Sequence, residues 1–182
     1  IGATFSYNLS TDAVYINSNK PIYLLHLTGY GCEVGAALLP KIECTGSRKV
    51  SFVRSTNEGF FIILFTKSGN EGSFTLNNDT SLIPANAFSN VPGTNGLYKY
   101  ARIPLSGSEI PTGVFSTVEN LQGLFHLGII NGSPGGGTRY GYFSNYNAFS
   151  YNLIANAAYY CEGDPLIITA NSVPGASYIW TG

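Results

Sequence analysis

Alternating apolar and polar positions mark one β-hairpin between Leu121 and Phe149. In its first half, the segment FHLGII (125–130) places alternate side chains on two strand faces. The following stretch NGSPGGG (131–137) is expected to be an irregular loop, because glycine keeps backbone entropy high and proline lacks an N–H. Residues 139–146 then return as a second strand. The pattern predicts a hairpin with a longer than minimal loop.

Short apolar runs separated by turn residues continue along the rest of the chain, without the three- and four-residue spacing of an amphipathic helix. At most one helical turn is expected, after Pro84. Residues 29–35 are expected to be irregular, and residues 72–76 to pair with residues 60–67. Strands are expected at 1–7, 13–16, 21–28, 49–54, 60–67, 72–76, 98–104 and 113–119, with a short apolar run at 36–39. This spacing predicts an all-β fold, an antiparallel β-sandwich of the jelly-roll or Greek-key type.

The pattern changes near residues 151–160. A cysteine, Cys161, then precedes a short apolar strand at 166–170, and Trp180 lies on the strand that would follow. A cysteine before one strand and a tryptophan on the next are typical of the opening of an immunoglobulin-like sandwich. We therefore expect a first domain over residues 1–155, lacking its N-terminal part. The first strands of a truncated immunoglobulin-like domain are expected over residues 156–182.

Composition narrows the class of protein. Of the 182 residues, 10% are charged and 14% are aromatic, a balance typical of extracellular β proteins. The absence of methionine indicates a chain processed or excised from a longer one. A net charge of −1 gives no basic field for nucleic acid, and no apolar run is long enough to span a membrane. We expect a secreted or cell-surface location.

The three cysteines favour an oxidising compartment. Cys32 and Cys44 flank one apolar segment and are predicted to form a disulfide, which would stabilise the fold by roughly 2–3 kcal/mol. A metal site at this pair is disfavoured because no second pair or nearby histidine completes four ligands. Cys161 is left unpaired within the chain, and its partner is expected in a later strand beyond Gly182.

Candidate catalytic residues are few. His26 and His126 each lie on an apolar strand, where a bonded core or edge residue is the more ordinary interpretation than a base or a metal ligand. No Gly-x-Ser-x-Gly nucleophile motif accompanies them. Glu109 and Glu119 offer a pair of carboxylates for glycoside hydrolysis, but both lie in or beside surface turns. These features favour a protein that is not an enzyme.

Cofactor sites are equally sparse. Asp12 and Asp79 lie in turns of the kind that supply calcium ligands, but the density of acidic residues is low. The glycine-rich stretch 132–137 is not a phosphate-binding loop, because neither a lysine nor a helix follows it. We predict no metal and no cofactor.

Aromatic residues beside the glycine-rich loop are the stronger indication of function. Tyrosine combines an apolar face with a polar tip and is frequent at binding surfaces. The alternative is that alternate members of this cluster belong to the core. The candidate binding residues are Asn131, Arg139, Tyr140, Tyr142 and Tyr146.

Three stretches resemble the IgGFc-binding-protein N-terminal-type domain. They are HLTGYGCEVGAALLPKIECTGSRKVSFVRST (26–56), IPANAFSNVPGTNGLYKYARIPL (83–105) and FHLGIINGSPGGGTRYGYFSNY (125–146), and the resemblance covers about Ser10 to Phe149. The segment from Cys161 resembles the start of the PKD-like or immunoglobulin-like repeats of adhesins secreted by Bacteroidota. Neither resemblance supplies catalytic residues.

The resemblance implies a non-enzymatic module of a large, secreted, multi-domain surface adhesin, used in attachment or gliding and exported by a type IX secretion system. Its implied partners are a surface glycan or protein ligand, secretion or anchoring machinery, and further domains of the same chain. One alternative is a structural spacer or secretion-cargo domain with no ligand of its own. A second alternative is a glycan-processing enzyme.

Overall fold

The computed structural model describes residues 3–42, 45–144, 153–155 and 168–170. The chain divides into two compact units, residues 1–147 and residues 148–182. In the described part of the first unit, the strands form antiparallel sheets and the helical elements are two three-residue 3-10 turns. The predicted all-β, antiparallel sandwich is confirmed. Neither 3-10 turn, in the part of the chain described here, has the length or apolar character to cross a membrane.

A five-stranded sheet forms the middle of the first unit. Its central strand β4 (Gly59–Lys67) lies between β9 (Phe125–Ser133) and β7 (Tyr98–Pro104). Strand β10 (Gly137–Phe143) extends the sheet beyond β9, and the short strand β6 (Ser89–Asn90) extends it beyond β7. Every residue of the β4 segment 60–64 is at least partly buried, because layers cover both faces of this sheet.

A three-stranded sheet covers one face of the five-stranded sheet. Strand β8 (Phe115–Asn120) lies between β3 (Lys49–Val53) and β5 (Phe74–Leu76). The expected pairing of 72–76 with 60–67 was therefore wrong, because β5 pairs with β8. Its side chains Phe74 and Leu76 enter the core from the three-stranded sheet, opposite β4. The two 3-10 turns are η1 (Glu71–Ser73) and η2 (Ala85–Ala87), the second at the turn expected after Pro84.

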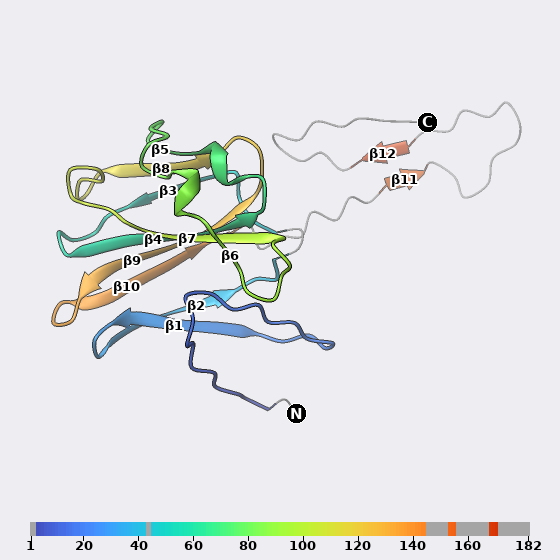
Figure 1. The fold of residues 1–182 in the computed structure, drawn as a ribbon, viewed down its shortest axis with the longest axis horizontal. Helices are drawn as coiled ribbons and strands as arrows, with labels where there is room; N and C mark the ends of the chain where they lie inside the picture. The colour runs from blue at the N-terminus through green and yellow to red at the C-terminus, as the bar shows by residue number, and fades with distance from the viewer. Residues whose placement is uncertain (1–2, 43–44, 145–152, 156–167, 171–182) are drawn as a thin grey trace, which may run out of the picture. The chain divides into compact units, whose positions relative to one another are not determined.

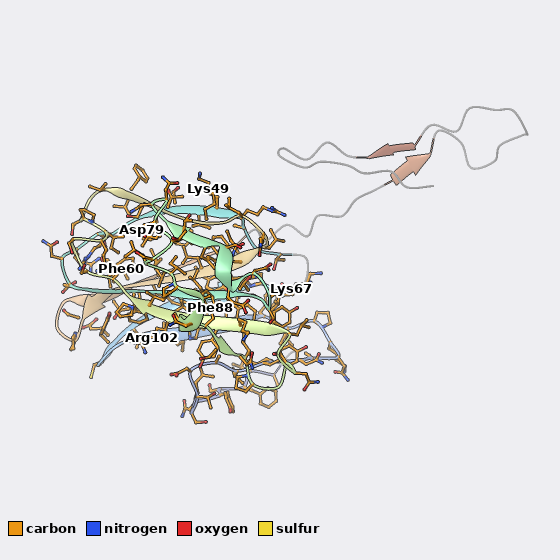
Figure 2. The ribbon with its side chains drawn as sticks, turned by 45° about the horizontal axis from the view of Figure 1, so that its top comes forward. Lys49, Phe60, Lys67, Asp79, Phe88 and Arg102 are labelled. Atoms are coloured by element: carbon orange, nitrogen blue, oxygen red, sulfur yellow. The ribbon has the colours of Figure 1, made fainter. Side chains whose placement is uncertain are left out.

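The hydrophobic core lies between these two sheets. Phe60, Ile62 and Leu64 point into it from β4, and Phe74 and Val118 point into it from the three-stranded sheet. Phe74 stacks on Phe88 with ring centroids 5.2 Å apart. Figure 2 places the labelled Phe60 and Phe88 between Lys49 on one side of the unit and Arg102 on the other.

A β-hairpin forms a third layer on the other face of the five-stranded sheet (Figure 1). It consists of β1 (Leu24–Tyr30) and β2 (Glu33–Leu39), in register from Leu24↔Leu39 to Tyr30↔Glu33. The expectation that residues 29–35 are irregular was wrong. Gly31 has a φ of 57°, which lets the chain reverse in two residues and keeps the flanking residues in the ladder.

The hairpin is fixed to β10 by one threonine. The Thr138 hydroxyl accepts a hydrogen bond from the Tyr30 N–H at 3.1 Å and donates one to the Glu33 carbonyl at 2.9 Å. Gly35 makes a close approach possible nearby, because a Cβ there would lie 2.5 Å from the Tyr140 Cβ. The outward face of the hairpin is apolar and exposed, and it carries Leu25, Leu27, Val34 and Leu38.

The hairpin predicted between residues 121 and 149 is confirmed as β9 and β10, but its loop is much shorter than expected. Strand β9 runs through Ser133 and β10 begins at Gly137, so only residues 134–136 connect them. The expectation of an irregular stretch from Asn131 to Gly137 was wrong because β4 pairs with β9 up to Gly132 and extends its ladder.

Residues 3–23 contain no strand. The strand predicted at 13–16 was wrong, and so was the described part of the one at 1–7. The apolar residues of these segments do not pack against the core, and Val14, Tyr15 and Ile16 are exposed. The strand expected from Pro21 begins only at Leu24.

In the second unit, the described residues form one antiparallel pair. Strand β11 (Leu153–Ala155) pairs with β12 (Ile168–Ala170). The division between units lies at 147/148, whereas the sequence placed the boundary at 155/156. The immunoglobulin-like identity of this second unit stays a prediction, and Cys161 lies outside the described residues.

Candidate functional site

A cleft of about 220 Å³ opens on the outward face of the five-stranded sheet, beside the β1–β2 hairpin. Its floor is apolar and aromatic, and a few charged or polar groups surround it, which is the usual composition of a ligand site. The lining residues are Leu9, Asp12, His26, Thr28, Gly29, Phe61, Ile63, Tyr100 and Arg102.

Strand alternation positions the floor of this cleft. Phe61 and Ile63 are the β4 residues that point away from the core, since their neighbours 60, 62 and 64 point into it. Arg102 is the partner of Ile63 in the β4–β7 register, and Tyr100 lies two residues before it on the same face. The sheet therefore presents two aromatic rings, one aliphatic side chain and one cation side by side.

Arg102 stacks on the aromatic floor. Its guanidinium carbon lies 4.0 Å from the centroid of the Phe61 ring, a cation–π contact. Tyr30 contacts the same ring edge-to-face at 5.8 Å. Among the described residues, no carboxylate lies within ion-pair distance of Arg102, and its side chain is exposed. The guanidinium is therefore held by stacking while its charge remains available.

A second arginine, Arg54, lies on the core side of the sheet, with its guanidinium carbon 5.9 Å from the centroid of the Phe60 ring. Arg54 is only 4% exposed, and in the part of the chain described here its hydrogen bonds go to the carbonyls of Thr56, Asn57 and Glu58 and not to a carboxylate. Burial raises the pKa of Tyr30, while the charges of Arg102 and Arg54 act to lower it. Both cations therefore act on the same phenol beside the cleft.

His26 enters the cleft from β1. The Tyr140 hydroxyl lies 2.8 Å from its Nδ1, and the two rings meet edge-to-face with centroids 5.4 Å apart. Burial lowers the pKa of His26, so its imidazole is neutral at pH 7. Tyr140 thus fixes the orientation of a neutral imidazole at the cleft wall.

The residues proposed from the sequence occupy different places. Tyr140 and Tyr142 are half-buried on the sheet face toward the hairpin. Tyr140 contacts His26 at the cleft wall, whereas the ring of Tyr142 lies 6.1 Å from that of His126. Arg139 is exposed, with its Nη1 3.3 Å from a carboxylate oxygen of Glu58. Tyr146 lies outside the described residues.

Asn131 is not a loop residue open to a ligand. It is 2% exposed, and its Oδ1 accepts hydrogen bonds from the backbone N–H groups of Ser55 and Thr56 at 3.1 and 2.9 Å. Its Nδ2 donates to the Gly59 carbonyl at 3.2 Å. The asparagine therefore holds the turn between β3 and β4, and the sequence gives no sign of this because the turn lies more than 70 residues away.

The sequence did contain a signal for Arg102 and Tyr100. The segment YKYARIP (98–104) alternates, which places residues 98, 100 and 102 on one face of a strand. What the alternation does not reveal is that this face is the outward one and that Phe61 lies beneath the guanidinium.

Neither cysteine of the predicted disulfide is shown in a bond. Cys32 is exposed with a free thiol, and Cys44 lies outside the described residues. The predicted pairing of Cys32 with Cys44 therefore stays a prediction.

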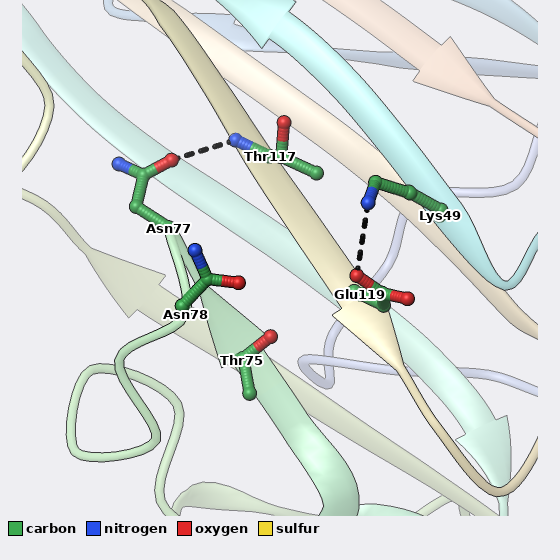
Figure 3. A pocket seen from close by; sticks show the side chains of 6 residues that line it. All are labelled: Lys49, Thr75, Asn77, Asn78, Thr117 and Glu119. Carbon is green, nitrogen blue, oxygen red and sulfur yellow. Dashed lines mark hydrogen bonds and ion pairs between the residues drawn. The ribbon is translucent and has the colours of Figure 1, made fainter.

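A second hollow lies on the outer face of the three-stranded sheet (Figure 3). It is also about 220 Å³ in volume, but polar groups line it throughout. Several of them bind one another: Lys49 and Glu119 form an ion pair at 3.1 Å, and the Thr117 N–H donates to the Asn77 Oδ1 at 2.8 Å. This polar groove (Lys49, Thr75, Asn77, Asn78, Thr117 and Glu119) resembles an ordinary solvated sheet face.

The carboxylates considered for hydrolysis or calcium binding have separate partners. Glu109 accepts hydrogen bonds from the hydroxyl and the N–H of Ser106, which lower its pKa, while Glu119 pairs with Lys49. Asp79 is bonded in the same way by Ser81, and its pKa is also lowered. Within the described residues, no three His, Cys, Asp or Glu side chains gather into a group that could hold a metal ion.

No protein-family model, curated protein or solved structure matches this chain. The resemblance to the IgGFc-binding-protein N-terminal-type domain and to PKD-like repeats therefore stays a prediction.

Proposed function

We propose that this chain is a non-enzymatic binding module of a secreted, multi-domain cell-surface adhesin that functions in attachment or gliding. The observation that carries the proposal is the cleft beside the β1–β2 hairpin, where Arg102 stacks on Phe61 above an apolar floor. Aromatic and arginine side chains of this kind dominate recognition surfaces. A surface glycan or a protein segment is the ligand class that fits such an open cleft.

The wider setting of the proposal follows the sequence. A composition low in charge and rich in aromatic residues suits an exported β-sandwich, and the second unit continues the chain as a further module. Export by a type IX system, and contact with secretion or anchoring machinery, belong to the proposal on the strength of the resemblance alone.

The test is a screen of the purified protein against immobilised glycans and cell-surface proteins. We expect at least one component to bind, Tyr100→Ala to weaken that binding, and Thr117→Ala in the polar groove to leave it unchanged. Thermal melts of both variants would show that they remain folded. Failure of every component to bind, or equal loss in the Thr117 variant, would contradict the proposal.

A structural spacer is the second candidate, and one observation favours it. The outward face of the β1–β2 hairpin exposes Leu25, Leu27, Val34 and Leu38 together, and contiguous apolar patches on a surface often mark contacts with another domain. A spacer predicts the opposite result in the same screen: a folded protein that binds no glycan and no surface protein.

A further inference from the structure

We infer that the cleft beside the β1–β2 hairpin binds the carboxylated end of an acidic glycan, with Arg102 pairing to the sugar carboxylate. The inference rests on the proposed function and names the ligand class of the same site. Its basis is the juxtaposition of one available guanidinium, an apolar floor and a polar wall within one cleft.

The geometry of Arg102 suits a planar anion. The Phe61 ring lies 4.0 Å from the guanidinium carbon and covers one side of the group. Arginine presents its N–H donors as a rigid planar fork that matches a carboxylate. A carboxylate accepts two parallel hydrogen bonds from that fork, which is the strongest pairing that arginine offers. The described residues place no carboxylate of the protein within ion-pair distance, so the ligand does not have to displace an internal partner.

The rest of the cleft suits a sugar ring and not a second charge. Ile63 and Tyr100 provide apolar surface for the C–H groups of a ring. The Thr28 hydroxyl and the Asp12 carboxylate provide partners for sugar hydroxyls, which both donate and accept hydrogen bonds. Asp12 would repel a polyanion such as a phosphorylated ligand, whereas it accepts hydrogen bonds from the hydroxyls of a ligand with a single carboxylate.

The size of the cleft points to one terminal residue. Its volume of about 220 Å³ is below the roughly 300–1,000 Å³ typical of pockets that enclose a whole small molecule. The cleft is also open to solvent along the side of Arg102, whose side chain is exposed. We therefore expect it to hold the end of a longer chain, the rest of which extends over the surface.

Isothermal titration calorimetry with two matched sugars tests the inference. The probes are 3′-sialyllactose and lactose, which differ only in the carboxylated residue. We expect binding of sialyllactose, at least about tenfold weaker binding of lactose, and a similar loss for sialyllactose with Arg102→Ala. Arg102→Lys is expected to be intermediate, because lysine keeps the charge without the planar fork. Raising the salt concentration is expected to weaken the binding of sialyllactose.

Lys67→Ala is the matched control. Lys67 pairs with Tyr98 at the far end of the β4–β7 ladder, so this variant removes the same charge from the same sheet away from the cleft. Equal affinities for the two sugars, or equal effects of the Lys67 and Arg102 variants, would overturn the inference. If neither sugar binds and methyl β-glucuronide, a sugar with a single carboxylate and no sialic acid, also fails, the inference is overturned. Binding of neutral glycans in the wider screen would then leave the proposed function standing.

Discussion

The two faces of the five-stranded sheet differ in the side chains that they present and in how completely they are covered. Toward the three-stranded sheet, β4 directs Phe60, Ile62 and Leu64 into a core formed by apolar side chains. Toward the β1–β2 hairpin, the same strand directs Phe61 and Ile63 at a cation, a histidine and tyrosines. One face is closed and apolar, and the other is only partly covered.

This difference separates stability from recognition within a single strand. The apolar side chains of the inner face are buried away from water. Burial of apolar surface is the main favourable term in the free energy of folding. The outer face meets a hairpin whose Gly35 and Thr138 contacts bring it close, yet the hairpin leaves a cleft over Phe61. A ligand can therefore bind on the outer face without disturbing the core.

The largest expected effect on stability comes from shortening a core side chain on the inner face of the sheet. Leu64 is fully buried, so Leu64→Ala removes apolar contacts and leaves a cavity, at a cost of about 2–5 kcal/mol of unfolding free energy. Urea unfolding, followed by far-UV circular dichroism, measures the change in unfolding free energy. Leu25→Ala on the exposed face of the hairpin is the control, and we expect it to change stability by less than about 0.5 kcal/mol. Similar costs for the two variants would contradict the assignment of inner and outer faces.

The buried histidine of the outer face should make stability depend on pH. Burial lowers the pKa of His126 from 6.5 to about 4, with the backbone of Ile42 acting in the opposite direction. The unfolded chain binds a proton at higher pH than the folded one, so stability is complete above about pH 6.5 and falls as the pH drops toward 4. The loss amounts to about 3 kcal/mol.

Unfolding midpoints measured from pH 7.5 to pH 4 test this dependence. His126→Leu is expected to remove most of the slope within that interval, and the smaller slope that remains belongs to His26, whose pKa burial also lowers. The lowered pKa values of Glu58, Asp79 and Glu109 affect stability mainly as the pH falls through their ordinary values of 4.5, 3.8 and 4.5, so the interval from pH 6.5 to pH 5 reports chiefly on the histidines. A wild-type curve that is flat between pH 6.5 and pH 5 would contradict the burial of a neutral His126.

A smaller effect is expected from pushing the hairpin away from the outer face. A side chain at Gly35 would meet the Tyr140 Cβ at 2.5 Å, so Gly35→Val is expected to cost about 1–3 kcal/mol and to loosen the β1–β2 hairpin. Hydrogen exchange should then quicken in β1 and β2 while β4 stays protected. Gly135→Ala is the control, because a Cβ there has no neighbour within 4 Å. Unchanged exchange in β1 and β2 would show that the hairpin does not pack as described.

The smallest expected effect is the loss of one hydrogen bond at the cleft wall. Tyr140→Phe keeps the ring and removes the hydroxyl that lies 2.8 Å from the His26 Nδ1, at a cost of about 0.5–1.5 kcal/mol. The NMR signals of the His26 ring should shift, and those of the His126 ring should not. Unchanged signals of the His26 ring would contradict the claim that the Tyr140 hydroxyl orients this imidazole.

The sequence predicted the elements better than their partners. The apolar run 60–67 and the strand from 98 to 104 were predicted from short-range patterns, because alternation and β-branched or aromatic content act locally. The pairing of β5 with β8 and the burial of Asn131 depend on contacts far along the chain. Local patterns carry no information about such contacts.

The candidate site was predicted only in part. Tyr140 and Tyr142 were chosen for their aromatic character, and the structure places them on the sheet face that carries the cleft. Arg102 was not chosen, since a single arginine in a strand has no pattern of its own. Its interest arises from its stacking on Phe61, 41 positions earlier in the chain.

The most direct test of the central claim is to map where 3′-sialyllactose contacts the folded protein. Two-dimensional amide NMR during a titration reports this residue by residue. The account predicts shifts confined to β1, β4 and β7 around Thr28, Phe61 and Arg102, on the outward face of the five-stranded sheet. Shifts confined to Lys49, Thr117 and Glu119 in the polar groove would contradict it, because the ligand would then bind the opposite face of the sandwich.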